Sequence, residues 1–156
     1  MKKLVSRFMA VLMAMTMILS MSMTAFAAEA QKGTLTVKNT VAGKTLDLYQ
    51  IFTATKSGDN VAYTLNSAYE GFFQSKITDA SALTGEALSE KAYDYVKTQV
   101  GTDGSNGAAF AKDMLGWILD SKNNITATKT VVTTAPSTQI SDLAYGYYLV
   151  YPKGAT

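Results

Sequence analysis

Residues 45–54 (TLDLYQIFTA) constrain the fold more than any other segment of this sequence. The segment has the β-branched and aromatic composition of a strand, yet it is apolar on both faces. One face carries Leu46, Leu48 and Phe52, and the other carries Tyr49 and Ile51. A strand of this kind has to be covered on both sides, so it lies in the middle of a sheet or beneath another layer. The sequence therefore predicts a layered fold built around residues 45–54.

Four other segments have the alternating or β-branched pattern of strands. They are residues 34–37, 61–65, 127–134 and 146–151. The polar loop over residues 56–60 has the composition of a hairpin turn between the central strand and residues 61–65. In the last strand, alternation places Tyr147, Leu149 and Tyr151 on one face and Tyr148 and Val150 on the other.

The middle of the chain has helical periodicity instead. We expect a short helix over residues 69–77 and two longer amphipathic helices over residues 86–100 and 108–120. Each longer helix must lay its apolar stripe on something, most simply a sheet face. The order of elements predicts a mainly β, α+β fold. Its architecture is either a β-sandwich or an open antiparallel sheet, with a helical insertion at about 69–120.

The N-terminus has the pattern of a signal peptide. Three basic residues, Lys2, Lys3 and Arg7, precede an apolar run of about 16 residues, which is short for a membrane span of roughly 20. Ala25-Phe26-Ala27 then forms a small-x-small cleavage site, and Ala28-Glu29-Ala30 is a second choice. We predict a signal peptide over residues 1–27 and a single domain over residues 28–156; an uncleaved anchor is the alternative.

Removing this leader changes the charge argument. Of 156 residues 129 remain, basic residues fall from 14 to 11, all 12 acids stay, and the formal charge moves from +2 to −1. The basic character of the whole chain therefore gives no reason to expect nucleic acid as a partner, and we expect membrane contact only through the leader before cleavage.

Cysteine and histidine are both absent from the sequence. Disulfides, thiolate metal sites, cysteine nucleophiles and imidazole bases are therefore excluded. The residues contain no motif that demands a reaction, so we expect a protein that is not an enzyme and has no cofactor or metal. An enzyme of this composition would need a pair of carboxylates, as in glycoside hydrolysis.

Several other groups resemble sites, but their residues favour a structural interpretation. The loop 103–107 resembles a calcium loop only loosely, because it lacks further acids at alternate positions. The carboxylates of one helix face fit a solvated surface better than a catalytic pair. Tyrosines of the last strand, and Trp117, fit packing better than a sugar platform. The helix-face acids are Glu86, Glu90 and Asp94, and the tyrosines are Tyr147, Tyr148 and Tyr151.

Lys38 ends the first strand and is a candidate for an internal amide crosslink. Such a bond joins a neutral lysine amine to an Asn or Asp side chain with the help of a further carboxyl group. All three groups have to be buried, because burial lowers the pKa of the lysine and raises that of the acid. A surface lysine at a strand end is the alternative, and the sequence identifies no partner.

The segment 33–55 (GTLTVKNTVAGKTLDLYQIFTAT), with residues 69–73 and the late 143–150 (LAYGYYLV), resembles the N-terminal domain of Gram-positive isopeptide-forming fimbrial subunits. These major backbone pilins are secreted and polymerised by sortases. The resemblance covers nearly all of the chain after the leader and depends on the order and spacing of its parts. It implies an Ig-like, Cna-type β-sandwich and a structural role in a surface pilus.

The resemblance also implies an acceptor lysine, to which a sortase joins the sorting motif of another subunit. The segment Val150-Tyr151-Pro152-Lys153 matches the end of the family's acceptor pattern, with Ala144 and Tyr148 where a Trp and a Val are usual. Lys153 is therefore the acceptor candidate. Expected partners are other pilin subunits, a sortase and a signal peptidase, and the expected location is secreted, on the bacterial cell surface or in its cell wall.

Besides the enzyme with a carboxylate pair, one other functional interpretation stays open from the sequence. The chain could be a secreted adhesin that binds glycan or a host matrix protein through exposed tyrosines and the helical insertion.

The sequence ends at Thr156 just after a predicted strand, with no sorting motif. We therefore expect either a small complete protein or a fragment truncated at its C-terminus.

Overall fold

The computed structural model describes residues 16–18, 32–57, 60–101 and 106–153. Its centre is the strand β3 (Thr45–Ser57), which lies in a five-stranded antiparallel sheet. Strand β7 (Gly146–Lys153) pairs along one edge of β3. The other edge of β3 pairs with β4 (Asn60–Leu65) and β5 (Lys129–Val132). As the two-sided apolar pattern predicts, β3 is therefore an interior strand.

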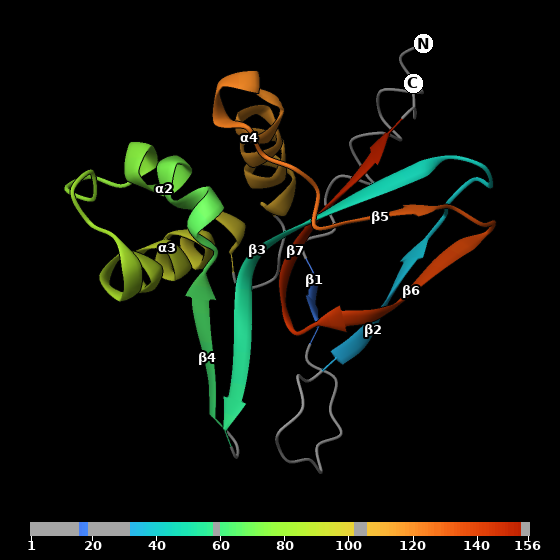
Figure 1. Cartoon of the computed structure of the whole chain (residues 1–156), viewed down its shortest axis with the longest axis horizontal. Coiled ribbons are helices and arrows are strands. Elements are labelled where there is room, and N and C mark those ends of the chain that lie inside the picture. Colours follow the sequence, from blue (N-terminus) through green and yellow to red (C-terminus); the bar gives the residue numbers. More distant parts are fainter. Residues whose placement is uncertain (1–15, 19–31, 58–59, 102–105, 154–156) are drawn as a thin grey trace.

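A second sheet covers one face of the first (Figure 1). It consists of β2 (Lys32–Lys38) and β6 (Ser137–Ala144), paired antiparallel. Side chains from both sheets form one core between them. Its buried members are Leu35, Val37, Leu46, Leu48, Ile140, Leu143, Tyr145, Tyr148 and Val150.

Three α-helices cover the opposite face of the central sheet (Figure 1). They are α2 (Glu70–Lys76), α3 (Gly85–Val100) and α4 (Gly107–Leu119), with the short 3₁₀ turns η1 (Ser67–Tyr69) and η2 (Ser121–Asn123) beside them. Their apolar stripes bury a second, larger core, the helical core, against β3 and β7. The three helices agree with the predicted ranges to within one residue at each end.

One β-bulge corrects the predicted face of Phe52. We expected Phe52 to share a face with Leu46 and Leu48, but it lies in the helical core with Tyr49 and Ile51. The register between β3 and β7 shifts between Gln50 and Phe52, so Ile51 is an extra residue on β3. An extra residue reverses the alternation beyond it. The bulge thus gives two successive large side chains to the helical core.

Strand β6 was missing from the prediction. Its buried Ile140 and Leu143 are three residues apart, whereas a regular strand would bury every second residue. The register between β2 and β6 shifts between Gly33 and Leu35, so β6 holds one extra residue at this point. Asp142, which has a positive φ, lies in this part of β6. This irregular spacing hides the strand from a test for alternation.

The fold class is thus α+β with antiparallel sheets, as expected. The leader predicted over residues 1–27, including its cleavage site at Ala27 and Ala28, lies almost wholly outside the described residues. The exception is the short strand β1 (Thr16–Ile18), which pairs antiparallel with the Gly146–Tyr148 part of β7. In the described part of the chain, no helix is long and apolar enough to cross a membrane.

Gly146 allows the backbone of β7 to lie close against β3. A Cβ atom there would overlap the carbonyl oxygen of Phe52 and lie 3.0 Å from the Gln50 side-chain nitrogen. We predict that Gly146→Ala lowers the free energy of unfolding by about 1–3 kcal/mol, measured by urea denaturation. Gly116 on α4 has open space around it. The control Gly116→Ala should leave stability unchanged or raise it by up to about 1 kcal/mol. Equal effects of the two variants would contradict the account.

Candidate functional site

Lys153, the predicted acceptor, is the last described residue of β7. It pairs with Thr45 at the start of β3, so its backbone is part of the central sheet. Pro152 before it is buried, whereas the Lys153 side chain is 53% exposed. The structure therefore combines a fixed backbone with a primary amine that solvent, or a protein partner, can reach.

Among the described residues, Asp47 forms the ion pair with this amine. The Lys153 Nζ atom lies 3.5 Å from Asp47 Oδ2, and the Asp47 side chain is only 9% exposed. Thr130 on β5 donates a hydrogen bond of 2.7 Å to the other carboxylate oxygen. Asp47 is thus held from β5 on one side and faces Lys153 of β7 on the other. A buried carboxylate needs partners of this kind to offset its desolvation.

Tyr49 completes the polar group on this face of β3. Burial, and after it the charge of Asp47, raise the pKa of Tyr49 to about 12; further causes are Tyr151 and a hydrogen bond with Asp47. Because residues two apart share a strand face, Asp47 and Tyr49 both lie on the helical face of the sheet. At this end of the sheet, a small polar cluster therefore replaces the apolar helical core. It consists of Tyr49, Asp47, Thr130 and Lys153.

Sequence reasoning missed Asp47, although a signal was present. Asp47 is the only acid in a strand that is otherwise apolar on both faces. An acid in such a strand has to be buried with partners, and buried charges of this kind are common at functional sites. What the sequence could not supply was the pairing of β3 with β7, which brings Lys153 to Asp47 across 106 positions of the chain.

Lys38, the candidate for an internal amide, lies at the end of β2 opposite Ser137. Its side chain is exposed, and no ion pair or side-chain hydrogen bond of Lys38 is found within the described part of the chain. The burial that an amide-forming triad requires is therefore not met at this position. The exposed strand end fits the alternative, a surface lysine.

The tyrosines of β7 pack rather than form a platform. Tyr148 is 1% exposed and donates a hydrogen bond to the Ala144 carbonyl oxygen. Tyr147 is half-buried among Phe52, Tyr63 and Tyr93, with ring centroids 5.2–6.1 Å from its own. Tyr151 is half-buried against the helical core. The interpretation as packing residues is confirmed for Tyr147 and Tyr148, and it fits Tyr151.

The acidic face of α3 is also as expected. Glu86, Glu90 and Asp94 are all exposed, and Asp94 forms an ion pair of 3.3 Å with Lys97 one turn on. The calcium-like loop lies largely outside the described residues, since 102–105 are not described. Among the residues that are described, no three acids gather in a way that could hold a metal ion.

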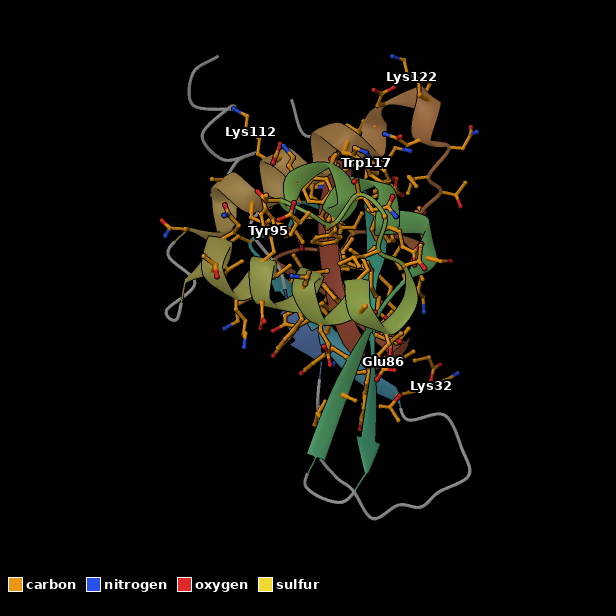
Figure 2. The ribbon with its side chains drawn as sticks, turned by 90° about the vertical axis from the view of Figure 1, so that its left-hand side faces the viewer. Lys32, Glu86, Tyr95, Lys112, Trp117 and Lys122 are labelled. Atoms are coloured by element: carbon orange, nitrogen blue, oxygen red, sulfur yellow. The ribbon has the colours of Figure 1, made fainter. Side chains whose placement is uncertain are left out.

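Trp117 lies in a groove between α2 and α4. The helical layer faces the viewer in Figure 2, where Trp117 is visible between these helices. The groove has a volume of about 560 Å³. Its lining residues are Phe72, Ser75, Lys76, Ala109, Lys112, Asp113, Gly116 and Trp117. The sequence singled out Trp117 but not the groove, because the contact of α2 with α4 cannot be inferred from either helix alone.

Comparison with known protein families, curated proteins and solved structures gives no match for this chain. The candidate sites therefore depend on the geometry of this chain's own residues.

Removing the Asp47 carboxylate should lower stability more than removing the carboxylate of an exposed acid. Asp47→Ala leaves the Thr130 hydroxyl and the Tyr49 hydroxyl without their acceptor. We predict a loss of about 1–3 kcal/mol in the free energy of unfolding, measured by urea denaturation at pH 7. The exposed Asp94→Ala is the matched control and should change stability by less than about 0.5 kcal/mol. A loss no larger than that of the control would contradict the buried role of Asp47.

Tyr49 should make the fold sensitive to alkaline pH. Its pKa in the folded state is raised from 10.0 to about 12, so ionisation is harder in the folded chain than in the unfolded one. The resulting stability is fully present below pH 10 and is lost as pH rises from about 10 to 12. In urea denaturation across this range, Tyr49→Phe should reduce the slope of stability against pH by up to about 1.4 kcal/mol per pH unit. An unchanged slope would show that Tyr49 ionises equally easily in both states.

Proposed function

We propose that this chain is an exported structural subunit of a sortase-assembled surface pilus, and that Lys153 is its acceptor lysine. The single observation that carries the proposal is the position of Lys153. Its amine is exposed at the end of a strand that is paired with the central strand of the fold. Lys153 also ends the Val-Tyr-Pro-Lys segment, which matches the end of the acceptor pattern that the family resemblance implies.

The chemistry of an acceptor needs little from the protein beyond a reachable amine in a fixed place. In the reaction that the resemblance implies, the Lys153 nitrogen, as the neutral amine, attacks the thioester carbon that joins another subunit's sorting motif to the sortase cysteine. A C–N bond forms, the C–S bond breaks, and one proton passes from the nitrogen to the departing sulfur. A rigid strand end lowers the entropic cost of placing the amine at that carbon.

Asp47 supports this role by positioning the amine. Lysine side chains have several rotatable bonds and lose considerable rotamer entropy when they are held in one place. The carboxylate of Asp47 lies 3.5 Å from Nζ and is itself held by Thr130. It attracts the lysine head group toward the end of the sheet while more than half of the side chain stays exposed.

A shaft role also fits the layered fold. We propose that the two stacked antiparallel sheets form an Ig-like, Cna-type sandwich, with residues 69–120 as its helical insertion. The partners would be other pilin subunits, a sortase and a signal peptidase that removes residues 1–27. The product would be secreted and attached to the cell surface through the polymer.

Lys153→Arg tests the acceptor assignment with little change in charge or size. Arginine keeps the attraction to Asp47, but its guanidinium group stays protonated and cannot act as the nucleophile. We predict that this variant abolishes the high-molecular-weight ladder in immunoblots of cell-wall extracts from the producing cell.

Lys44→Arg is the matched control, because Lys44 is an exposed lysine next to Thr45, the residue that pairs with Lys153. The control should keep the ladder. A ladder that persists in Lys153→Arg would exclude Lys153 as the acceptor.

A further inference from the structure

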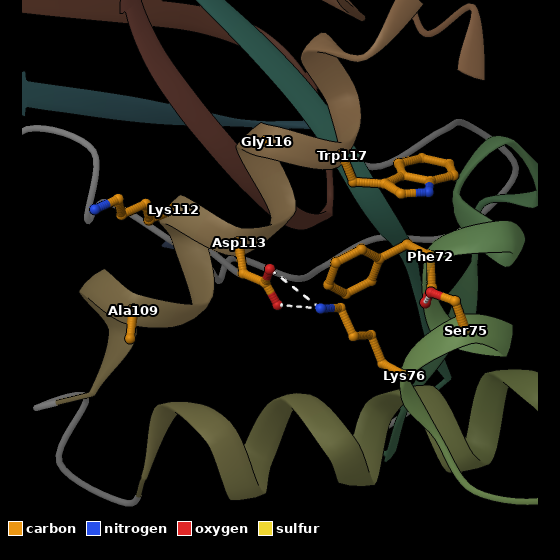
Figure 3. A pocket seen from close by; sticks show the side chains of 8 residues that line it. All are labelled: Phe72, Ser75, Lys76, Ala109, Lys112, Asp113, Gly116 and Trp117. Atoms are coloured by element: carbon orange, nitrogen blue, oxygen red, sulfur yellow. Dashed lines mark hydrogen bonds and ion pairs between the residues drawn. The ribbon is translucent and has the colours of Figure 1, made fainter. Parts of the chain in front are cut away.

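The groove between α2 and α4 is separate from the Lys153 site and has its own chemistry. Lys76 of α2 forms an ion pair of 2.9 Å with Asp113 of α4. Figure 3 shows this pair with the rings of Phe72 and Trp117 beside it, while Lys112 points away from the pair. The Lys76 and Asp113 side chains are 36% and 47% exposed, so a ligand can reach both.

The aromatic part of the groove is held in place. The centroid of the Trp117 ring lies 6.0 Å from that of Phe72, in an edge-to-face contact, and 6.4 Å from that of Tyr69. A Cβ on Gly71 would lie 3.1 Å from the Trp117 ring, so glycine at this position lets the indole lie against α2. Trp117 nevertheless stays only half-buried. Part of the Trp117 ring is therefore exposed in the groove and held in a fixed position. This favours binding, because the side chain loses little conformational freedom when a ligand binds.

The polar part of the groove carries both signs of charge side by side. The hydrogen bond to Asp113 raises the pKa of Lys76, so the ammonium group stays charged. Each charge is neutralised by the other, which gives an ionic ligand no advantage at this pair. A neutral ligand that donates to the carboxylate and accepts from the ammonium at the same time is the complementary partner.

From this arrangement we propose that the groove binds a neutral hexopyranose unit of a glycan. Two neighbouring hydroxyl groups of the sugar would bridge Lys76 and Asp113, and the C–H face of its ring would pack on Trp117. A groove of about 560 Å³ lies within the size range of small-molecule sites, whereas a stable protein interface buries a much broader surface. The proposal adds a second activity to the subunit and does not depend on Lys153.

The binding test has a built-in probe, because Trp117 is the only tryptophan of the chain. The purified full chain is titrated with the methyl glycosides of glucose, galactose and mannose, and tryptophan fluorescence is recorded. At least one of the three should give a saturable change with a Kd on the order of 1–10 mM. No saturable change with any of them up to about 50 mM would overturn the proposal.

Two variants localise the binding. Nothing lies within 4 Å of the position that a Cβ would take on Gly116, so Gly116→Leu should fold normally and fill the groove. It should abolish the fluorescence response. Asp113→Asn should weaken binding about tenfold, because a charged acceptor is lost.

Asp94→Asn is the matched control, since Asp94 forms the other lysine–aspartate pair described on a helix, with Lys97 outside the groove. It should leave the Kd unchanged. An undiminished response in Gly116→Leu, or equal effects of Asp113→Asn and Asp94→Asn, would place the binding elsewhere and overturn the proposal.

Discussion

The antiparallel pairing of β3 with β7 holds the two layers of the molecule together. Both strands are buried on both faces, so the two strands together separate two cores. Leu48 and Val150 face the β2–β6 sheet, and Tyr49 and Leu149 face the helices. Each large apolar side chain buried in this way contributes about 1.5–3 kcal/mol, and neither layer could bury its apolar surface without the shared sheet.

The same pairing creates the candidate site. Asp47 is opposite Tyr151, and Thr45 is opposite Lys153, so the register alone brings an acid and a lysine to one end of the sheet. A shift of one residue would place Lys153 on the other face. The Gln50–Phe52 bulge and Gly146 fix this register at the far end of the two strands. The position of the exposed amine is therefore a consequence of how the sheet is packed.

Local patterns in the sequence predicted the parts of the fold that local physics determines. Helical periodicity located α2, α3 and α4, and the two-sided apolar character of residues 45–54 identified the central strand. The errors were made where one extra residue breaks alternation, at Ile51 in β3 and at Asp142 in β6. Of the sites, Lys153 was found by family resemblance, whereas Trp117 was singled out by its residue type and interpreted as a packing residue. Asp47 and Asp113 acquire their partners through long-range packing, which neither periodicity nor composition can reveal.

We propose that the amine at the end of β7 is the point of covalent attachment between subunits. The most direct measurement is tandem mass spectrometry of proteolytic fragments after the full chain is incubated with a pilus-forming sortase and a peptide carrying its sorting motif. We predict a branched fragment in which the sorting peptide is joined by an amide bond to Lys153 Nζ. A branch at Lys44, Lys129 or another lysine, with Lys153 unmodified, would contradict it.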